Sequence, residues 1–363
     1  MERLDTVIVG AGVVGLAVAR SLALSGREVT VLEAEINSGQ HCSSRNSGVI
    51  HAGLYYPPGS LKATLCVRGR ALLYEYCDEK GIPCDPIGKL IVATSAEELA
   101  TLAEIRECAV ANGVNDLEQL SPGEAMNVEA LVQCEGALYS PLTGIVDTGE
   151  LMLSLQGDIE QLGGSIIFDS RVSNVHEGGD GIGFTVGEEA FACRTMINAT
   201  SLWGSELVRN VISPKLLPAV RLAIGHYFSL PGKSPFQHLV YPVPSGGGLG
   251  IHATNDFGGA VRFGPDVAWT DDIDYSFDES CKPRFVAAIR KYYPELDVER
   301  LQPAFTGIRP RLSGPGQAAA DFVIQTEVDH GVPGLVNLLG IDSPGLTASL
   351  AIADYVTKTL VRG

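Results

Sequence analysis

Two histidines and one arginine lie in sequence settings that suit proton transfer and anion binding. His51 is followed by the small residues Ala52 and Gly53, where a cofactor ring could approach the backbone closely. His252 lies in an expected strand over residues 249–253, after a glycine-rich turn at 246–248. Imidazole titrates near neutral pH and can accept a proton during turnover. Arg309 lies in a Gly-Ile-Arg-Pro sequence, and a guanidinium can grip a carboxylate through two parallel hydrogen bonds.

Each of these residues also has a purely structural interpretation. Either histidine could be a hydrogen-bonded structural imidazole. Arg309 could simply pair with an acid, because the chain has 43 acidic and 26 basic residues among 363 and a net charge of −17. Arg311 is a second candidate anchor, since alternate residues of a strand share a face, although Pro310 intervenes. We expect no metal site because no His and Cys pairs have metal-ligand spacing, and no Gly-x-Ser-x-Gly sequence supports serine hydrolase chemistry.

A glycine motif between a strand and a helix gives the clearest cofactor signal. The expected unit is a strand, three glycines, a helix and a second strand, at residues 6–9, Gly10, Gly12, Gly15, 16–24 and 28–32. The glycines allow a tight turn, close approach of the backbone to a pyrophosphate, and close packing of helix on strand. The helix N-terminus attracts phosphates. Glu33, at the end of the second strand, can accept hydrogen bonds from a ribose diol, which disfavours NADP but leaves NAD and FAD open.

The chain after Glu33 favours FAD over NAD. An NAD dehydrogenase would continue with alternating strands and helices, whereas here a polar loop precedes an expected helix at 60–80, with Ser60 as its cap. A strand at 171–175 could lie beside the adenine, and a turn at 340–345 could bind the electron-rich N1/O2 edge of a flavin. The residues expected to contact the cofactor are Gly10, Gly12, Val14, Gly15, Glu33, Ala34, Ser43, Ser44, Arg45, Asn46, Ser47, Val172, Ala199, Thr200, Gly340, Asp342, Ser343, Gly345, Leu346 and Thr347.

Longer stretches spread over essentially the whole chain carry a family resemblance. The most specific begins Ser43-Ser44-Arg45-Asn46-Ser47-Gly48 and extends through residue 68, and others lie at 88–93, 143–147, 241–244, 250–252, 306–309 and 343–347. Together they resemble the L-2-hydroxyglutarate dehydrogenase/oxidase family, within the D-amino-acid-oxidase-like flavoproteins. The resemblance implies dissociable FAD and hydride transfer from an L-2-hydroxy acid, foremost L-2-hydroxyglutarate, to flavin N5, which yields the 2-oxo acid. The electron acceptor could be a quinone, an electron-transfer protein or oxygen.

Two other functions stay open on the same scaffold. The run Arg309-Pro310-Arg311 is closer to the glycine and D-amino-acid oxidases, so an amino acid or glycerol 3-phosphate could be the substrate. A non-catalytic flavin-binding redox module is the third alternative. The presence of Arg309, His51 and His252 together favours an enzyme over such a module.

The expected fold is α/β (α+β), with a Rossmann-like FAD-binding domain interleaved with a mixed or antiparallel β-sheet substrate domain. Residues 1–85, 145–215 and 305–363 are assigned to the first domain, and 86–144 and 216–304 to the second. The acid excess argues against nucleic acid and against an anionic membrane surface as partners. Eight scattered cysteines without a CxxC pair, and no segment that suits a spanning helix, favour a cytoplasmic protein, either free or held at the inner membrane through its electron acceptor.

Overall fold

The first of two large sheets has a parallel core that matches the expected nucleotide-binding unit. The computed structural model describes residues 2–179, 181–244 and 250–362. Within them, β1 pairs in parallel with β2 and β12, β2 with β9, and β12 with β20, and an antiparallel β10–β11 hairpin extends one edge. The strands are β1 (Glu2–Val9), β2 (Val29–Leu32), β9 (Ser165–Ile167), β10 (Val172–Gly178), β11 (Gly181–Val186), β12 (Glu189–Asn198), β19 (Val323–Gln325) and β20 (Leu335–Leu339).

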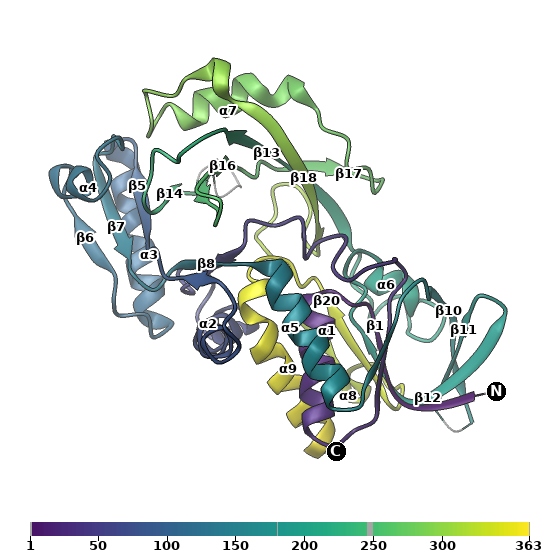
Figure 1. The fold of residues 1–363 in the computed structure, drawn as a ribbon. Coiled ribbons are helices and arrows are strands. Elements are labelled where there is room, and N and C mark those ends of the chain that lie inside the picture. The colour runs from purple at the N-terminus through teal and green to yellow at the C-terminus, as the bar shows by residue number, and fades with distance from the viewer. Residues whose placement is uncertain (1, 180, 245–249, 363) are drawn as a thin grey trace.

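Helices from distant parts of the chain cover this sheet. The helices α1 (Val13–Leu24), α5 (Thr148–Gln161) and α9 (Gly345–Arg362) lie side by side, and α2 (Leu61–Lys80) packs on α9 (Figure 1). Their apolar faces form one core with β1 and β2. The predicted cap of α2 is present, since the Ser60 hydroxyl accepts a hydrogen bond from the Ala63 N–H at 3.1 Å. None of the helices within the described ranges combines the length and hydropathy needed to cross a membrane.

The second large sheet is mixed and lies above the first in Figure 1. The strand β18 pairs along one edge of β13, and β17 and β16 pair with the two ends of its other edge. From β16 the sheet continues in the order β15-β14-β5-β7-β6. The strands of this sheet are β5 (Lys89–Ala93), β6 (Glu118–Leu120), β7 (Gly136–Ser140), β13 (Arg221–Leu230), β14 (Leu239–Pro242), β15 (Ala253–Asn255), β16 (Val261–Phe263), β17 (Ala268–Thr270) and β18 (Gln302–Arg311). The pair β5–β14 is parallel, whereas the other pairs are antiparallel.

Helices pack on this mixed sheet as well, and a small third sheet lies near the junction. The helix α7 (Lys282–Ile289) packs on β13 and β16 through a core of aromatic side chains, and α3 (Leu99–Ala111) and α4 (Pro122–Val128) pack near β5 and β7. The third sheet joins β3 (Val49–Ile50), β4 (Cys84–Asp85) and β8 (Gly144–Val146). Two short helices, α6 (Gly204–Leu207) and α8 (Glu327–His330), complete the α-helices of the described ranges.

The expected fold class is confirmed, although the structure differs locally from the sequence-based expectation. The strand expected at 249–253 is wrong for its described part: β15 begins only at Ala253, because Gly250 has a φ of +81°, outside the strand region. Residue 249 and the turn expected at 246–248 lie outside the described residues. The strand β18 pairs with β13 along its length, so residues 305–311 belong to the mixed sheet although the sequence division grouped them with the FAD-binding part. The domain division itself stays a prediction.

Gly69 tests the close packing of α2 on α9. A Cβ at this position would meet the carbonyl oxygen of Thr347 and lie 2.7 Å from the Cα of Ala348, so the two backbones would have to separate. We expect Gly69→Ala to lower the free energy of unfolding by about 1–3 kcal/mol. Gly157→Ala in α5 is the control, because no atom lies within 4 Å of the added carbon, and alanine should stabilise that helix by about 0.5–1 kcal/mol. Urea denaturation measures both; equal stability of the two variants would contradict the packing argument.

Candidate active site

A cavity of about 1090 Å³ is lined by residues from both large sheets. This volume slightly exceeds the usual range for small-molecule sites, roughly 300–1,000 Å³, and leaves room for a dinucleotide beside a small substrate. Every predicted site residue lines the cavity except Ser44, Gly340 and Thr347. The structure therefore brings His51, His252 and Arg309 to the same cavity as the glycine motif, although these residues are far apart in the sequence.

The three exceptions have different positions. Ser44 is exposed, and Gly340, with a φ of +65°, begins the turn before α9. Thr347 is fully buried behind the cavity wall. Its hydroxyl accepts a hydrogen bond from the His51 N–H at 3.0 Å and donates one to the Val49 carbonyl at 3.2 Å. Thr347 therefore holds His51 in place from behind.

The nucleotide end of the cavity is built as the motif predicts, with one addition. Gly10 has a φ of +106°, and a Cβ there would lie 2.8 Å from the Ala199 carbonyl oxygen, so only glycine fits. The Glu33 carboxylate lines the cavity and also accepts hydrogen bonds from the N–H groups of Ala11 at 2.6 Å and Glu35 at 2.9 Å. The acid expected to bind a ribose therefore also fixes the glycine turn.

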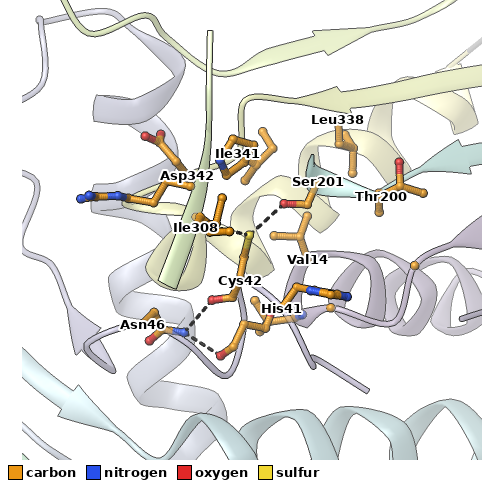
Figure 2. Close-up of a pocket in the computed structure, with 18 of the residues that line it drawn as sticks. Val14, His41, Cys42, Asn46, Thr200, Ser201, Ile308, Leu338, Ile341 and Asp342 are labelled. Atoms are coloured by element: carbon orange, nitrogen blue, oxygen red, sulfur yellow. Dashed lines mark hydrogen bonds between the residues drawn. The ribbon is translucent and has the colours of Figure 1, made fainter. Parts of the chain in front are cut away.

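The polar loop that follows Glu33 bridges the two sheets. The Ser43 hydroxyl accepts a hydrogen bond from the Val13 N–H at 3.0 Å, in the first turn of α1. The Asn46 amide donates to the carbonyls of Cys42 and Ser43, which folds the loop on itself (Figure 2). Arg45 donates to the Thr306 carbonyl of β18 at 3.2 Å. The loop thereby joins the helix N-terminus to the mixed sheet.

Cys42, in the same loop, is a structural thiol. Its sulfur donates to the Ile308 carbonyl at 3.1 Å and accepts a hydrogen bond from the Ser201 hydroxyl at 3.3 Å (Figure 2). Burial raises the pKa of Cys42 to about 11. The thiol stays protonated at neutral pH and is a weak nucleophile.

His51 lies next to a buried cation that the sequence did not reveal. The ammonium of Lys89 is fully buried, has no hydrogen-bond partner within the described ranges, and lies 4.9 Å and 4.8 Å from the ring centres of Tyr55 and Tyr241. Burial, with the Lys89 charge as the second cause, lowers the pKa of His51 to about 3, so its ring is neutral. The His51 Nε2 lies 3.3 Å from the Ser343 hydroxyl.

His252 is held by an aromatic stack. Its ring lies against Tyr241 with a centroid distance of 3.5 Å and an interplanar angle of 11°. Its exposed fraction is 5%, and it lines the cavity. Burial raises the pKa of Tyr55, Tyr227 and Tyr241, which also line the cavity, so these phenols are neutral. The sequence alone assigned these tyrosines no role, because nothing in their local pattern distinguishes a cavity tyrosine from a structural one.

Arg309 differs from the other candidate anchors. Its guanidinium donates to the backbone carbonyls of Asp266 at 2.6 Å and Ala223 at 3.5 Å, and no ion pair of Arg309 is found in the described part of the chain. Burial lowers its pKa. Arg311 is already paired: its Nε lies 3.1 Å from the Asp342 carboxylate, which Lys62 also contacts at 2.8 Å. The interpretation of Arg309 as a partner of an acid therefore finds no support.

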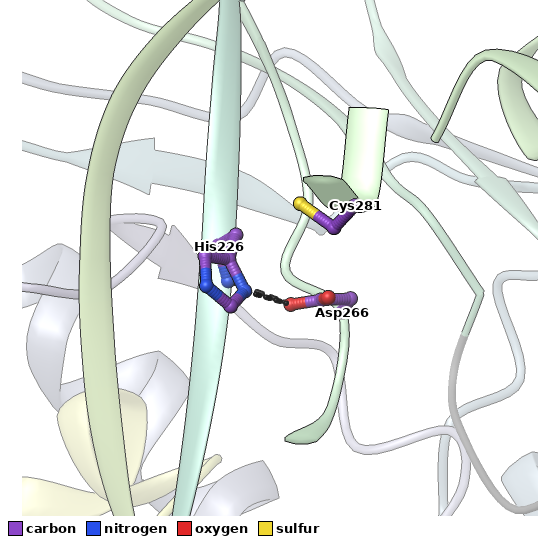
Figure 3. Close-up of side chains that lie close together, drawn as sticks. All are labelled: His226, Asp266 and Cys281. Carbon is purple, nitrogen blue, oxygen red and sulfur yellow. Dashed lines mark hydrogen bonds and ion pairs between the residues drawn. The ribbon is translucent and has the colours of Figure 1, made fainter. Parts of the chain in front are cut away.

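One group of buried side chains consists of residue types that can bind metal ions. Its carboxylate, however, contacts a guanidinium and an imidazole. His226, Asp266 and Cys281 are buried close together (Figure 3). The Asp266 carboxylate already binds the His226 ring and the Arg284 guanidinium, which occupies the place of a cation. Burial raises the pKa of the Cys281 thiol to about 11.

Comparisons with known proteins fit this geometry. The model of a family described as FAD dependent oxidoreductase matches residues 5–359. The mitochondrial L-2-hydroxyglutarate dehydrogenase of Arabidopsis thaliana is 44% identical, with 99% of this chain and 84% of that protein aligned. Its counterpart from Homo sapiens is 32% identical, with 97% and 87% aligned. The chain belongs to the L-2-hydroxyglutarate dehydrogenase family of FAD-dependent oxidoreductases.

The fold of this L-2-hydroxyglutarate dehydrogenase family member also has solved counterparts. The dithionite-reduced L-α-glycerophosphate oxidase of Mycoplasma pneumoniae, with FAD bound, superimposes with a TM-score of 0.89 at 26% identity and covers 99% of this chain and 95% of its own. The cavity residues fit FAD. The positive-φ turn at Gly10 and the start of α1 suit a pyrophosphate, Glu33 suits a ribose, and the start of α9 suits the flavin edge.

Lys89 gives a prediction for stability. Burial lowers its pKa from 10.5 to about 7. Below pH 7 both folded and unfolded chains hold the proton, and the folded chain carries the full cost of a buried charge. Between pH 7 and 10.5 only the unfolded chain holds it, so the stability of the wild type should rise with pH. We expect Lys89→Met to be more stable at pH 6 by roughly 3–5 kcal/mol, an advantage that shrinks towards pH 10.

Urea denaturation at pH 6, 8 and 10 measures this difference between variant and wild type. Lys358→Met is the control, because the Lys358 side chain is 67% exposed in α9. That variant should differ from the wild type by the same amount at every pH. A difference for Lys89→Met that is also constant with pH would show that Lys89 keeps an ordinary pKa.

Proposed function

We propose that the protein oxidises L-2-hydroxyglutarate to 2-oxoglutarate. The observation that carries this proposal is Arg309, a partly buried guanidinium that lines the cavity and whose hydrogen bonds within the described residues go only to backbone carbonyls. Such a group suits the carboxylate of a 2-hydroxy acid. The L-2-hydroxyglutarate dehydrogenases of Arabidopsis thaliana and Homo sapiens align over nearly the whole chain, which supports this substrate.

The residues of the cavity divide the work of the reaction. When bound, FAD supplies the acceptor for the hydride that leaves C2. Arg309 binds the substrate carboxylate and thereby fixes the position of C2. His252 takes the hydroxyl proton. His51 is less suited to hold that proton, because its pKa is lowered to about 3 by burial and by Lys89; it remains neutral and orients groups by hydrogen bonding.

The electron acceptor and the cellular location are also proposals. A quinone, an electron-transfer protein or oxygen could take the electrons, and the chain would act in the cytoplasm or at the inner membrane beside that acceptor. All eight cysteines are free thiols in the structure, which supports a reducing compartment. FAD is proposed to be dissociable, since His51 Nε2 already has the Ser343 hydroxyl as its neighbour.

Glycerol 3-phosphate is the second candidate substrate. The structural likeness to the glycerophosphate oxidase of Mycoplasma pneumoniae favours it. A phosphate ester would also need a cation, so Arg309 alone does not separate the two substrates. A substrate panel does.

Anaerobic bleaching of the flavin tests the proposed function. We expect L-2-hydroxyglutarate to bleach the oxidised flavin of the purified protein and to yield one 2-oxoglutarate per flavin. D-2-hydroxyglutarate, glycine, D-alanine and glycerol 3-phosphate should leave it oxidised over the same time. Acid precipitation of the same sample should release the FAD into solution. Bleaching by an amino acid or by glycerol 3-phosphate, and by no hydroxy acid, would contradict the proposed substrate.

Arg309→Lys tests the carboxylate anchor. Lysine keeps the charge but cannot form two parallel hydrogen bonds, so the KM for L-2-hydroxyglutarate should rise by about 10- to 100-fold. The limiting rate of flavin reduction should also fall, because C2 is held less well. Arg68→Lys is the control, since the Arg68 side chain is 60% exposed on α2 and does not line the cavity. Wild-type kinetics of Arg309→Lys would show that another group binds the carboxylate.

A further inference from the structure

We propose that Asp266 is a positioning residue for Arg309: its buried carboxylate, held by His226 and Arg284, fixes the Asp266 backbone carbonyl that orients the Arg309 guanidinium towards the substrate carboxylate. This inference rests on the proposed function of Arg309. It adds a group that never touches the substrate and that lies in the linker between β16 and β17. Asp266 belongs to the group of His226, Asp266 and Cys281, which has metal-ligand residue types. In this proposal, Asp266 of that group supports substrate binding instead.

Arg309 contacts the linker between β16 and β17 directly. The Nη2 of Arg309 donates to the backbone carbonyl of Asp266 at 2.6 Å, and Nε donates to the Ala223 carbonyl at 3.5 Å. These two bonds use two of the five N–H donors of a guanidinium and fix its plane. Because no acid of the described ranges pairs with Arg309, a substrate carboxylate can take the other donors.

The side chain of Asp266 fixes the linker to neighbouring elements. The Asp266 side chain is 4% exposed, and its Oδ1 accepts hydrogen bonds from the His226 backbone N–H at 2.7 Å and from the ring Nδ1 at 3.0 Å. Its Oδ2 accepts a hydrogen bond from Arg284 on α7. Figure 3 shows the carboxylate directed at His226 of β13. The carboxylate thus ties the linker to β13 and α7, while the carbonyl of the same residue serves Arg309.

A glycine on β13 leaves the space that the Arg309 guanidinium occupies. Gly225 follows Ala223 by two residues on β13, and a Cβ there would lie 2.9 Å from Arg309 Nη2 and 2.9 Å from the Asp266 carbonyl oxygen. It would also lie 2.6 Å from the Cβ of Pro265. The hydrogen bond between Arg309 and the linker therefore forms only because this strand position has no side chain. The strand β13, the β16–β17 linker and Arg309 are therefore packed directly against one another.

A double-mutant cycle tests the proposal on the FAD-loaded protein. The readout is the dissociation constant of 2-oxoglutarate, measured from the change in the flavin absorption spectrum. Asp266→Asn keeps the shape of the side chain but loses its charge, so the linker should loosen and the dissociation constant should rise by about tenfold. In the Arg309→Lys background the same change should raise it less than about twofold, because the anchor is already lost.

Asp158→Asn is the matched control. Asp158 is also a buried carboxylate, with Arg20, Lys80 and Tyr76 as partners, but it lies on α5 and does not line the cavity. This variant should lose stability and keep the wild-type dissociation constant. Arg284→Gln is the second variant, because the Arg284 side chain is 59% exposed and its loss should not prevent folding. It should weaken binding about threefold, again only when Arg309 is present.

The outcomes separate this inference from the proposed function. Equal effects of Asp266→Asn with and without Arg309, or an effect of Asp158→Asn of the same size, would overturn the positioning role. If L-2-hydroxyglutarate fails to bleach the wild-type flavin, the proposed function fails, and the cycle is repeated with glycolate, glycine or acetate, whichever perturbs the spectrum. If no carboxylate perturbs it, Arg309 is not a carboxylate anchor and both proposals fall.

Discussion

A partly buried guanidinium that has no ion pair among the described residues is the feature on which the proposed site depends. Removing a charge from water is costly, and the chain has 43 acidic residues that could have paired with Arg309. Instead the structure gives Arg309 two backbone carbonyls from β13 and the β16–β17 linker. In the proposed function an anionic substrate would offset this desolvation cost, although the protein has a net charge of −17.

The two sheets form one site because short polar contacts cross between them. The loop around Ser43 caps α1 on one side and binds β18 through Arg45 on the other. Thr347 at the start of α9 holds the backbone of His51. The residues proposed to bind the cofactor and those proposed to bind the substrate are thus connected through hydrogen bonds between side chains and backbone, so the fold sets the distance between the two regions.

Local signals in the sequence were sufficient to predict the strand–helix–strand unit around the glycine motif and the cap of α2. The glycine motif, Glu33 and the cap Ser60 act within a few residues or within one strand–helix–strand unit, and the structure has them as expected. Long-range features were not accessible. Lys89 has no unusual neighbours in sequence, and Asp266 meets Arg309 only after β13 and β18 pair. The strand expected around His252 failed because the backbone of Gly250, with a φ of +81°, leaves the strand conformation.

A crystal structure of the protein with FAD and 2-oxoglutarate tests most directly whether Arg309 binds the substrate carboxylate. The carboxylate next to the oxo group should lie within about 3 Å of two N–H groups of Arg309, with the oxo carbon facing the flavin and the ribose of the adenosine at Glu33. A ligand whose carboxylates contact neither nitrogen of Arg309, or an FAD that leaves Arg309 outside the substrate region, would contradict the central claim.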